Sequence, residues 1–125
     1  MEDGLHAALT RRILTCAIEV HRHLGPGLLE SVYESALSIE LTAASIPFKR
    51  QIGVPLFYKG QLLSEHRPDL VVGESVIVEI KAIERLDKIH IAQMLTYLKV
   101  TGLRVGLILN FNSAILVQGV RRVTL

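Results

Sequence analysis

The sequence has no tryptophan, and aromatic residues make up only 5% of its 125 residues. Hydrophobic residues nevertheless account for 50% of the chain, so a core must be built from aliphatic side chains. The single cysteine, Cys16, cannot form an internal disulfide, and it lies on the apolar side of a helical pattern. We expect Cys16 to be a small core residue and the protein to occupy a reducing cytoplasm.

Long apolar runs and a strong charge of either sign are also missing. The net charge is +2, so any attraction to nucleic acid would depend on a local basic patch. No apolar run approaches the roughly 20 residues that span a bilayer, and the N-terminal MEDGLHAALT lacks the apolar segment of a signal peptide. We expect a cytoplasmic protein without membrane contact. Phosphate-binding glycine loops, nucleophilic triads and zinc spacings are absent too, which disfavours a nucleotide-dependent enzyme.

A length of 125 residues fits one compact domain, and we treat residues 1–125 as that domain. Two amphipathic helices are predicted first. The earlier one carries an apolar stripe at spacings of three and four and ends at Gly25-Pro26-Gly27. The later one runs over residues 29–44 before Ile46-Pro47 breaks the pattern. Its expected core stripe consists of Leu29, Val32, Tyr33, Ala36, Leu37 and Leu41.

The period changes to that of strands from Phe48 onward. Residues 48–58 and 61–66 are typical of a hairpin around Lys59-Gly60, and further strands are predicted over residues 68–72 and 76–81. A third helix over residues 87–101 and strands over 105–111 and 114–120 complete the chain. This order predicts a mixed α/β or α+β sheet, in which the strands on either side of the third helix are parallel.

The segment RPDLVVGESVIVEIKA, residues 67–82, carries charge on two apolar strands. Alternation places Glu79 and Lys81 on one face of the second strand. Asp69 opposes Glu79 only if the hairpin pairs symmetrically about a single residue such as Glu74. A strict two-residue turn would instead put Asp69 opposite Val78, whereas a longer, bulged turn at Gly73 brings the two acids together.

Two neighbouring carboxylates repel unless a cation lies between them. A hard divalent ion such as Mg²⁺ prefers carboxylate oxygens and often binds phosphate as well. A lysine beside them can orient water and stabilise charge on phosphoryl oxygens, so the pattern favours phosphodiester hydrolysis. A surface ion pair, in which Lys81 neutralises Glu79 and Asp69 caps a strand, explains the same spacing.

Pro68-Asp69 followed by Glu79-Ile80-Lys81 resembles the PD-(D/E)xK signature of restriction-endonuclease-like nucleases. GLLESVY, residues 27–33, is similar to the motif of the GxxExxY proteins within that superfamily, and the resemblance extends over nearly the whole chain. It implies an α/β fold with an αβββαβ core, here with an extra N-terminal helix and a C-terminal strand. It also implies roles for individual residues: Asp69 and Glu79 as metal ligands, Glu30 as a third metal-binding acid, Lys81 at the attacking water, and Gln93 and Tyr97 positioning substrate.

Other polar side chains allow two interpretations. His90 shares a helix face with Gln93 and Tyr97 and is a further candidate for substrate contact. The alternative is that these three side chains make hydrogen bonds to the edges of buried strands. Tyr33 is a candidate for the same role, with a core aromatic as the alternative. Glu34 is expected at the surface. Glu40 falls within the apolar stripe, so it needs a partner and is a reserve ligand candidate.

The leading hypothesis is a nuclease dependent on Mg²⁺ or Mn²⁺ that acts on DNA rather than RNA. The alternative is a catalytically inactive nucleic-acid-binding or protein-assembly module that retains the nuclease fold. A domain of 125 residues has little beyond its core with which to grip a duplex, so a homodimer or a protein partner is considered in either case.

Overall fold

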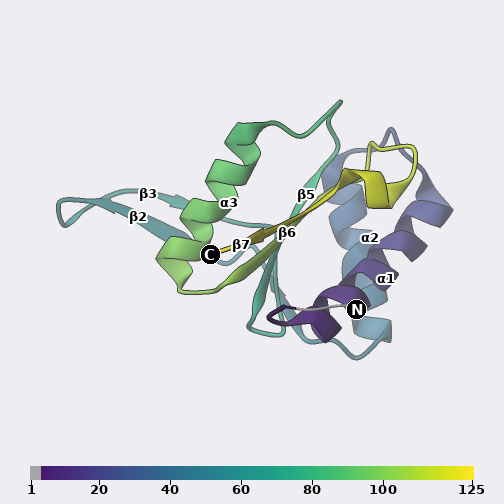
Figure 1. Ribbon diagram of the computed structural model, residues 1–125, viewed down its shortest axis with the longest axis horizontal. Helices are drawn as coiled ribbons and strands as arrows, with labels where there is room; N and C mark the ends of the chain where they lie inside the picture. Colours follow the sequence, from purple (N-terminus) through teal and green to yellow (C-terminus); the bar gives the residue numbers. More distant parts are fainter. Residues whose placement is uncertain (1–3) are drawn as a thin grey trace.

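The computed structural model describes residues 4–125 as a central sheet with helices on both faces (Figure 1). No helix in that range is long and apolar enough to cross a membrane. The helices are α1 (Ala7–Leu24), α2 (Glu30–Ala43), α3 (Lys88–Thr101) and the 3-10 helix η1 (Leu116–Gly119). The strands are β1 (Phe48–Arg50), β2 (Val54–Tyr58), β3 (Gln61–His66), β4 (Leu70–Val72), β5 (Val76–Lys81), β6 (Val105–Asn110) and β7 (Val120–Thr124).

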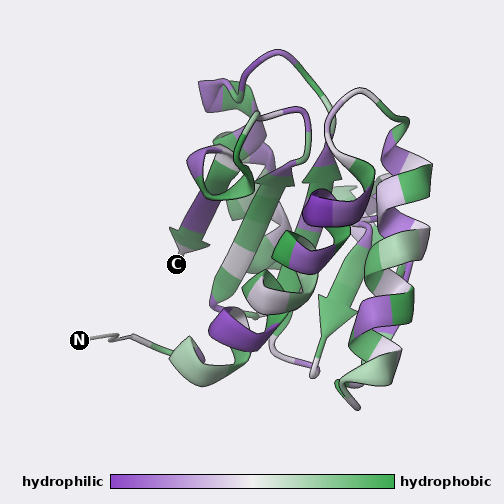
Figure 2. Ribbon diagram, turned by 90° about the vertical axis from the view of Figure 1, so that its right-hand side faces the viewer, coloured by the Kyte–Doolittle hydropathy of each residue, from purple (hydrophilic) through white to green (hydrophobic). Residues whose placement is uncertain are grey.

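Five of the strands form one mixed sheet in the order β1-β4-β5-β6-β7. β5 and β6 are parallel and joined through α3, as the crossover rule predicts, while the other neighbours are antiparallel. α1 and α2 lie in front of the sheet in Figure 2, and α3 covers the opposite face (Figure 1). The restriction-endonuclease-like core, with an extra N-terminal helix and a C-terminal strand, is confirmed.

Strand alternation along β5 divides the core into two clusters. Val76, Val78 and Ile80 belong to the cluster beneath α1 and α2. Ile77 packs instead with the side chains of α3, including Met94. Because residues two apart share a face, Glu79 and Lys81 project toward the α3 side of the sheet, as does Ile77.

The β4–β5 hairpin has the register that a site at Asp69 and Glu79 requires. Leu70 pairs with Val78 and Val72 with Val76, so the hairpin is centred on Glu74. Gly73 and Glu74 both have left-handed backbone conformations, with φ of 58° and 55°. The longer turn is therefore confirmed, and the register places Asp69, just before β4, opposite Glu79.

The expected strand over residues 114–120 is wrong. This segment holds η1 and only the first residue of β7, which pairs with β6 over residues 120–124. Leu116 is 3% exposed, while its neighbours Ile115 and Val117 are exposed. The same alternation is typical of a half-buried strand. Here it arises because Leu116, at the start of a short helical turn, packs into the core.

The predicted strand over residues 48–58 is interrupted in the middle. Residues 51–53 separate β1 from β2, and Gln51 has a left-handed φ of 54°. β2 pairs only with β3, forming a separate two-stranded sheet that projects from the body of the molecule (Figure 1). The chain leaves the main sheet after β1 and returns at Asp69.

Candidate active site

Two short hydrogen bonds from backbone amides hold the carboxylates of Asp69 and Glu79. The Asp69 amide donates to Glu79 Oε1 over 2.7 Å. The Ile80 amide, next along β5, donates to Asp69 Oδ2 over 2.7 Å. Each carboxylate is thus fixed at the point where β4 begins and the ladder between β4 and β5 ends.

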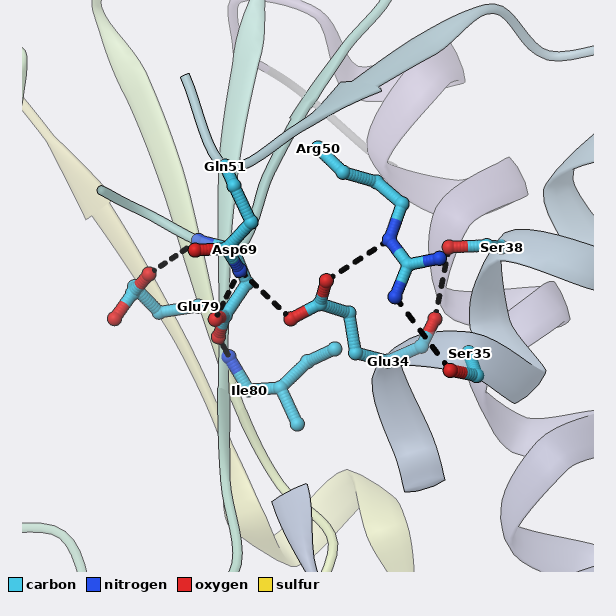
Figure 3. A network of polar contacts seen from close by, with 8 residues as sticks. All are labelled: Glu34, Ser35, Ser38, Arg50, Gln51, Asp69, Glu79 and Ile80. Atoms are coloured by element: carbon cyan, nitrogen blue, oxygen red, sulfur yellow. Dashed lines mark hydrogen bonds and ion pairs between the residues drawn. The ribbon is translucent and has the colours of Figure 1, made fainter. Parts of the chain in front are cut away.

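The two carboxylates turn to different sides of this point (Figure 3). The Glu79 carboxylate extends to one side of the strand, while that of Asp69 turns toward the Ile80 amide and Glu34. The opposed register is confirmed, but the side chains do not point toward a common centre in this conformation. Convergence on one ion therefore stays a prediction.

Both carboxyl groups are shifted toward the protonated form. Burial, followed by the negative charge of Asp69, raises the pKa of Glu79 to about 7. The hydrogen bond from the Asp69 amide and the charge of Lys81 lower it by smaller amounts. Burial likewise raises the pKa of Asp69 to about 6, with a further upward contribution from Glu34. Lys81 lowers the pKa of Glu79, but this effect is smaller than the effect of burial.

Glu34 belongs to the same cluster, so its expected place at the surface is wrong. Glu34 is only 7% exposed, and its Oε2 accepts a hydrogen bond from Arg50 Nε at 2.9 Å. The side-chain amide of Gln51 donates to Glu34 Oε1 over 3.0 Å and lies 3.4 Å from Asp69 Oδ1. Gln51 therefore bridges a helix carboxylate to the strand carboxylate (Figure 3).

The expected core stripe of α2 is confirmed for Tyr33, Leu37 and Leu41 but is wrong at its first two residues. Leu29 and Val32, placed in the core by the sequence, are 74% and 41% exposed. The buried residues of α2 are Tyr33, Glu34, Leu37, Ser38 and Leu41. That set repeats at spacings of three and four, so a stripe drawn through every such position would have included the polar residues.

Lys81 and Glu30 lie at the far end of β5. Lys81 Nζ is 4.0 Å from Glu79 Oε2, and its side chain is 21% exposed. Glu30 Oε2 accepts a hydrogen bond of 3.1 Å from the Ala82 amide, and its charge contributes to the raised pKa of Glu79. Within residues 4–125 no group of three His, Cys, Asp and Glu side chains is arranged to hold a metal ion.

α3 brings one of its two candidate positioning residues to the acids. Tyr97 is 3% exposed, and burial, followed by the charges of Glu79 and Asp69, raises its pKa to about 12. Gln93 is half-buried one turn earlier on the helix. His66 of β3 lies against Tyr97 with ring centroids 6.3 Å apart. Sequence reasoning missed His66, because only tertiary packing brings β3 to α3.

Three other candidates have structural roles. His90 accepts a hydrogen bond from the Asp87 amide at 2.9 Å, as part of the capping box of α3. Tyr33 is fully buried, stacks on Phe111 at 4.6 Å and donates its hydroxyl hydrogen to the Gly25 carbonyl. We therefore withdraw both as substrate-positioning residues. Glu40 lines a separate cavity of about 510 Å³ between α1 and α2, so it is no reserve ligand.

Cys16 also lines that cavity and is 7% exposed within the core, as the sequence predicted. Burial, together with the charge of Glu40, raises the pKa of its thiol. A raised pKa keeps the thiol protonated and weakly nucleophilic. Cys16 is accordingly a packing residue.

The carboxylate oxygens of Asp69 and Glu79 are of the chemical kind that a hard divalent cation prefers, although in this conformation the two groups do not face a common centre. One oxygen of each carboxylate is bound by a backbone amide, whereas Asp69 Oδ1 and Glu79 Oε2 have only the longer contacts to Gln51 and Lys81. Burial raises the pKa of both carboxyl groups, so a cation bound beside them would favour their charged forms. Mg²⁺ needs only one or two protein carboxylates when water and phosphate supply its other ligands.

Comparison with protein families identifies the class to which this fold and site correspond. Residues 7–123 match the PD-(D/E)XK nuclease superfamily. The chain belongs to that superfamily, and the match includes Asp69, Glu79 and Lys81. Searches of curated proteins and of solved structures found no significant match.

Proposed function

We propose that this protein is a nuclease that hydrolyses phosphodiester bonds in DNA with the help of Mg²⁺ or Mn²⁺. The observation that carries the proposal is the buried Glu79 carboxylate beside Lys81 and the half-buried Asp69 carboxylate just before the neighbouring strand, both with raised pKa values. Buried acids with raised pKa values are costly to a fold and typical of functional sites. The superfamily match supports the same conclusion.

In this proposal Asp69 and Glu79 hold the divalent cation through the oxygens that no backbone amide engages. A cation bound there lowers the pKa of water and neutralises charge on a phosphodiester. Lys81 stabilises negative charge that develops on the phosphoryl oxygens, because its ammonium group lies at the same end of β5. Tyr97 and Gln93 orient the scissile phosphate from α3.

The helix acid of the site is a choice between two residues. Glu30 was expected from the GxxExxY resemblance, and it is bonded to the Ala82 amide beyond Lys81. Glu34 lies closer to Asp69, to which Gln51 connects it. We propose that Glu34 supports Asp69 and that Glu30 lies on the Lys81 side, within a site of the GxxExxY type.

The test is a metal titration with single- and double-stranded DNA and RNA of mixed sequence. We expect cleavage of DNA that requires Mg²⁺ or Mn²⁺ and is lost in Asp69→Asn and in Lys81→Ala. Glu84→Gln and Lys99→Ala are matched controls, since they change an exposed acid and an exposed lysine outside the cluster.

Each outcome of this titration is decisive. Cleavage that persists in both Asp69→Asn and Lys81→Ala would show that another site or a contaminant is responsible. Preference for RNA would retain the site but exclude DNA as the substrate. Binding of nucleic acid without cleavage at any metal concentration would assign the chain to the non-catalytic modules.

A further inference from the structure

The β2–β3 hairpin is an arm attached to the body only at its base. Val54 is 1% exposed and packs in the cluster beneath α3, and His66 lies against Tyr97. Beyond these residues the two strands extend away from every helix (Figure 1). A two-stranded hairpin without further support is only marginally stable in water.

The outer half of this arm is apolar although it is exposed. Phe57, Tyr58, Leu62 and Leu63 are between 59% and 65% exposed. Phe57 opposes Leu62 across the hairpin, and a bulge adds Leu63 beside that pair. Alternation puts Phe57 and its partner Leu62 on one face of the hairpin and Tyr58 on the other. Large apolar side chains exposed together on one element are of the kind that marks an interaction site.

Charge on the arm is nearly balanced, which argues for a protein partner. Glu65 is paired with Arg67 at 2.8 Å. Lys59 at the tip lies 5.4 Å from the centre of the Tyr58 ring. Binding to a nucleic-acid backbone depends on several lysine or arginine contacts, and one lysine at the tip supplies little of that attraction. Two identical arms of this composition would not repel each other.

The strand edges of the arm also favour pairing with a like arm. β2 contains Pro55, which cannot donate a backbone hydrogen bond. β3 contains neither proline nor lysine, all six of its residues are exposed or half-exposed, and it pairs only with β2 among residues 4–125. Exposed edges usually carry such protective residues. β3 is thus the edge open to a second strand.

We propose that the arm is a homodimer contact, in which the apolar tips of two copies pack against each other around a twofold axis. Each of the four side chains contributes about 100 Å² of exposed surface, given the area of residues of this size. Because Tyr58 faces away from Phe57 and Leu62, a contact through one face buries at most three of these side chains in each copy, roughly 600 Å² in total and about 800 Å² with the flanking backbone, which is the size of a weak, transient interface. We therefore expect a weak dimer that forms only at high protein concentration.

The arm would also connect the dimer contact to the candidate active site. It begins after Gln51 and ends before Asp69, and the Gln51 amide donates to the Asp69 carbonyl over 3.0 Å. A dimer formed through this arm would fix two copies of the site relative to each other. The contact itself does not depend on the proposed nuclease activity.

Sedimentation velocity tests the proposal directly, because it measures mass without any substrate. Wild-type protein between about 1 and about 500 µM should convert from monomer to dimer, with the dimer forming toward the upper end of this range because the contact is weak. Leu63→Lys should remain monomeric. Ile39→Lys on α2 is the matched control, since Ile39 is 68% exposed against 65% for Leu63, and it should dimerise as the wild type does.

A mixture of Leu63→Lys and Leu63→Glu tests whether the two arms contact each other. Opposite charges across a twofold contact should restore the dimer that each variant alone has lost. A monomer at every wild-type concentration, or dimers that survive Leu63→Lys, would overturn the proposal. Loss without restoration would place Leu63 against another surface and exclude the twofold contact. A monomer whose arm variants lose DNA binding would assign the arm to nucleic acid instead.

Discussion

Substitution of Glu79 by glutamine should stabilise the protein at alkaline pH. Glu79 is 8% exposed, and burial together with the charge of Asp69 raises its pKa from 4.5 to about 7. Between these two values the folded protein binds more protons than the unfolded chain. The free energy of unfolding therefore falls as the pH rises from about 4.5 to about 7. Glutamine keeps an oxygen that can accept the hydrogen bond from the Asp69 amide, and its side chain carries no charge.

The size of the effect follows from the same pKa. A difference of about 2.5 in pKa corresponds to roughly 3 kcal/mol, since one pKa unit is about 1.4 kcal/mol. Local relaxation reduces this value, so we expect Glu79→Gln to be more stable than the wild type by about 1 to 3 kcal/mol at pH 8. In a domain of this size that gain raises the melting temperature by roughly 4 to 12 °C. Near pH 4.5 the difference should vanish, because Glu79 is then protonated in the folded wild type.

Thermal unfolding of both proteins between pH 4.5 and 8.5, with a chelator present, measures this dependence. Glu84→Gln is the control, since it removes an exposed carboxylate and should follow the wild type at every pH. If Glu79→Gln is less stable than the wild type at pH 8, the Glu79 carboxylate is a stabilising partner of Lys81 and the electrostatic reasoning is refuted. Millimolar Mg²⁺ should stabilise only proteins with Glu79 intact, because an ion that binds the native state raises its stability.

Three further predictions concern the neighbourhood of the site. Asp69→Asn should leave the metal-free fold equally or slightly more stable and should abolish stabilisation by Mg²⁺ in the same thermal assay; a loss of several kcal/mol would indicate a broken ion pair instead. Arg50→Ala should lower the free energy of unfolding by about 1 to 3 kcal/mol at neutral pH in urea titrations, because it leaves Glu34 buried without its 2.9 Å partner. Gly106→Ala should cost about 1 to 3 kcal/mol in the same titration, since a Cβ there would come within 2.4 Å of Met94 Sδ; unchanged stability would show that Met94 moves freely.

The hairpin over residues 67–82 shows how far sequence alone can reach. The alternation of apolar residues in β5 fixed Glu79 and Lys81 on one face, because side chains in a strand alternate with a period of two. The glycine in the turn indicated the longer loop, and the pairing centred on Glu74 confirms it. Local periodicity was sufficient for the face of each side chain, whereas the register needed the strand pairing itself.

Glu34 shows where sequence reasoning stops. The amphipathic pattern of α2 predicted a helix, but its apolar residues allowed more than one choice of buried face. Tyr33 stacks on Phe111 in the core, and the next residue, Glu34, faces the strands beside it. Arg50 is the last residue of β1 and Gln51 follows it, so the spacing of residues within α2 could not predict these partners.

The sequence by itself determined the three long helices, the parallel crossover and the shared face of Glu79 and Lys81, because each depends on neighbours within a few residues or on a general rule of chain connection. It left the register of the hairpin open between two turns, and the pairing of β4 with β5 decided it. The tertiary structure decided which way each helix faces, where the β2–β3 arm leaves the sheet and which groups surround the acids. Those features depend on contacts between segments far apart in the chain. The orientation of Asp69 is one example, since its carboxylate turns to partners supplied by β5 and by the residue after β1.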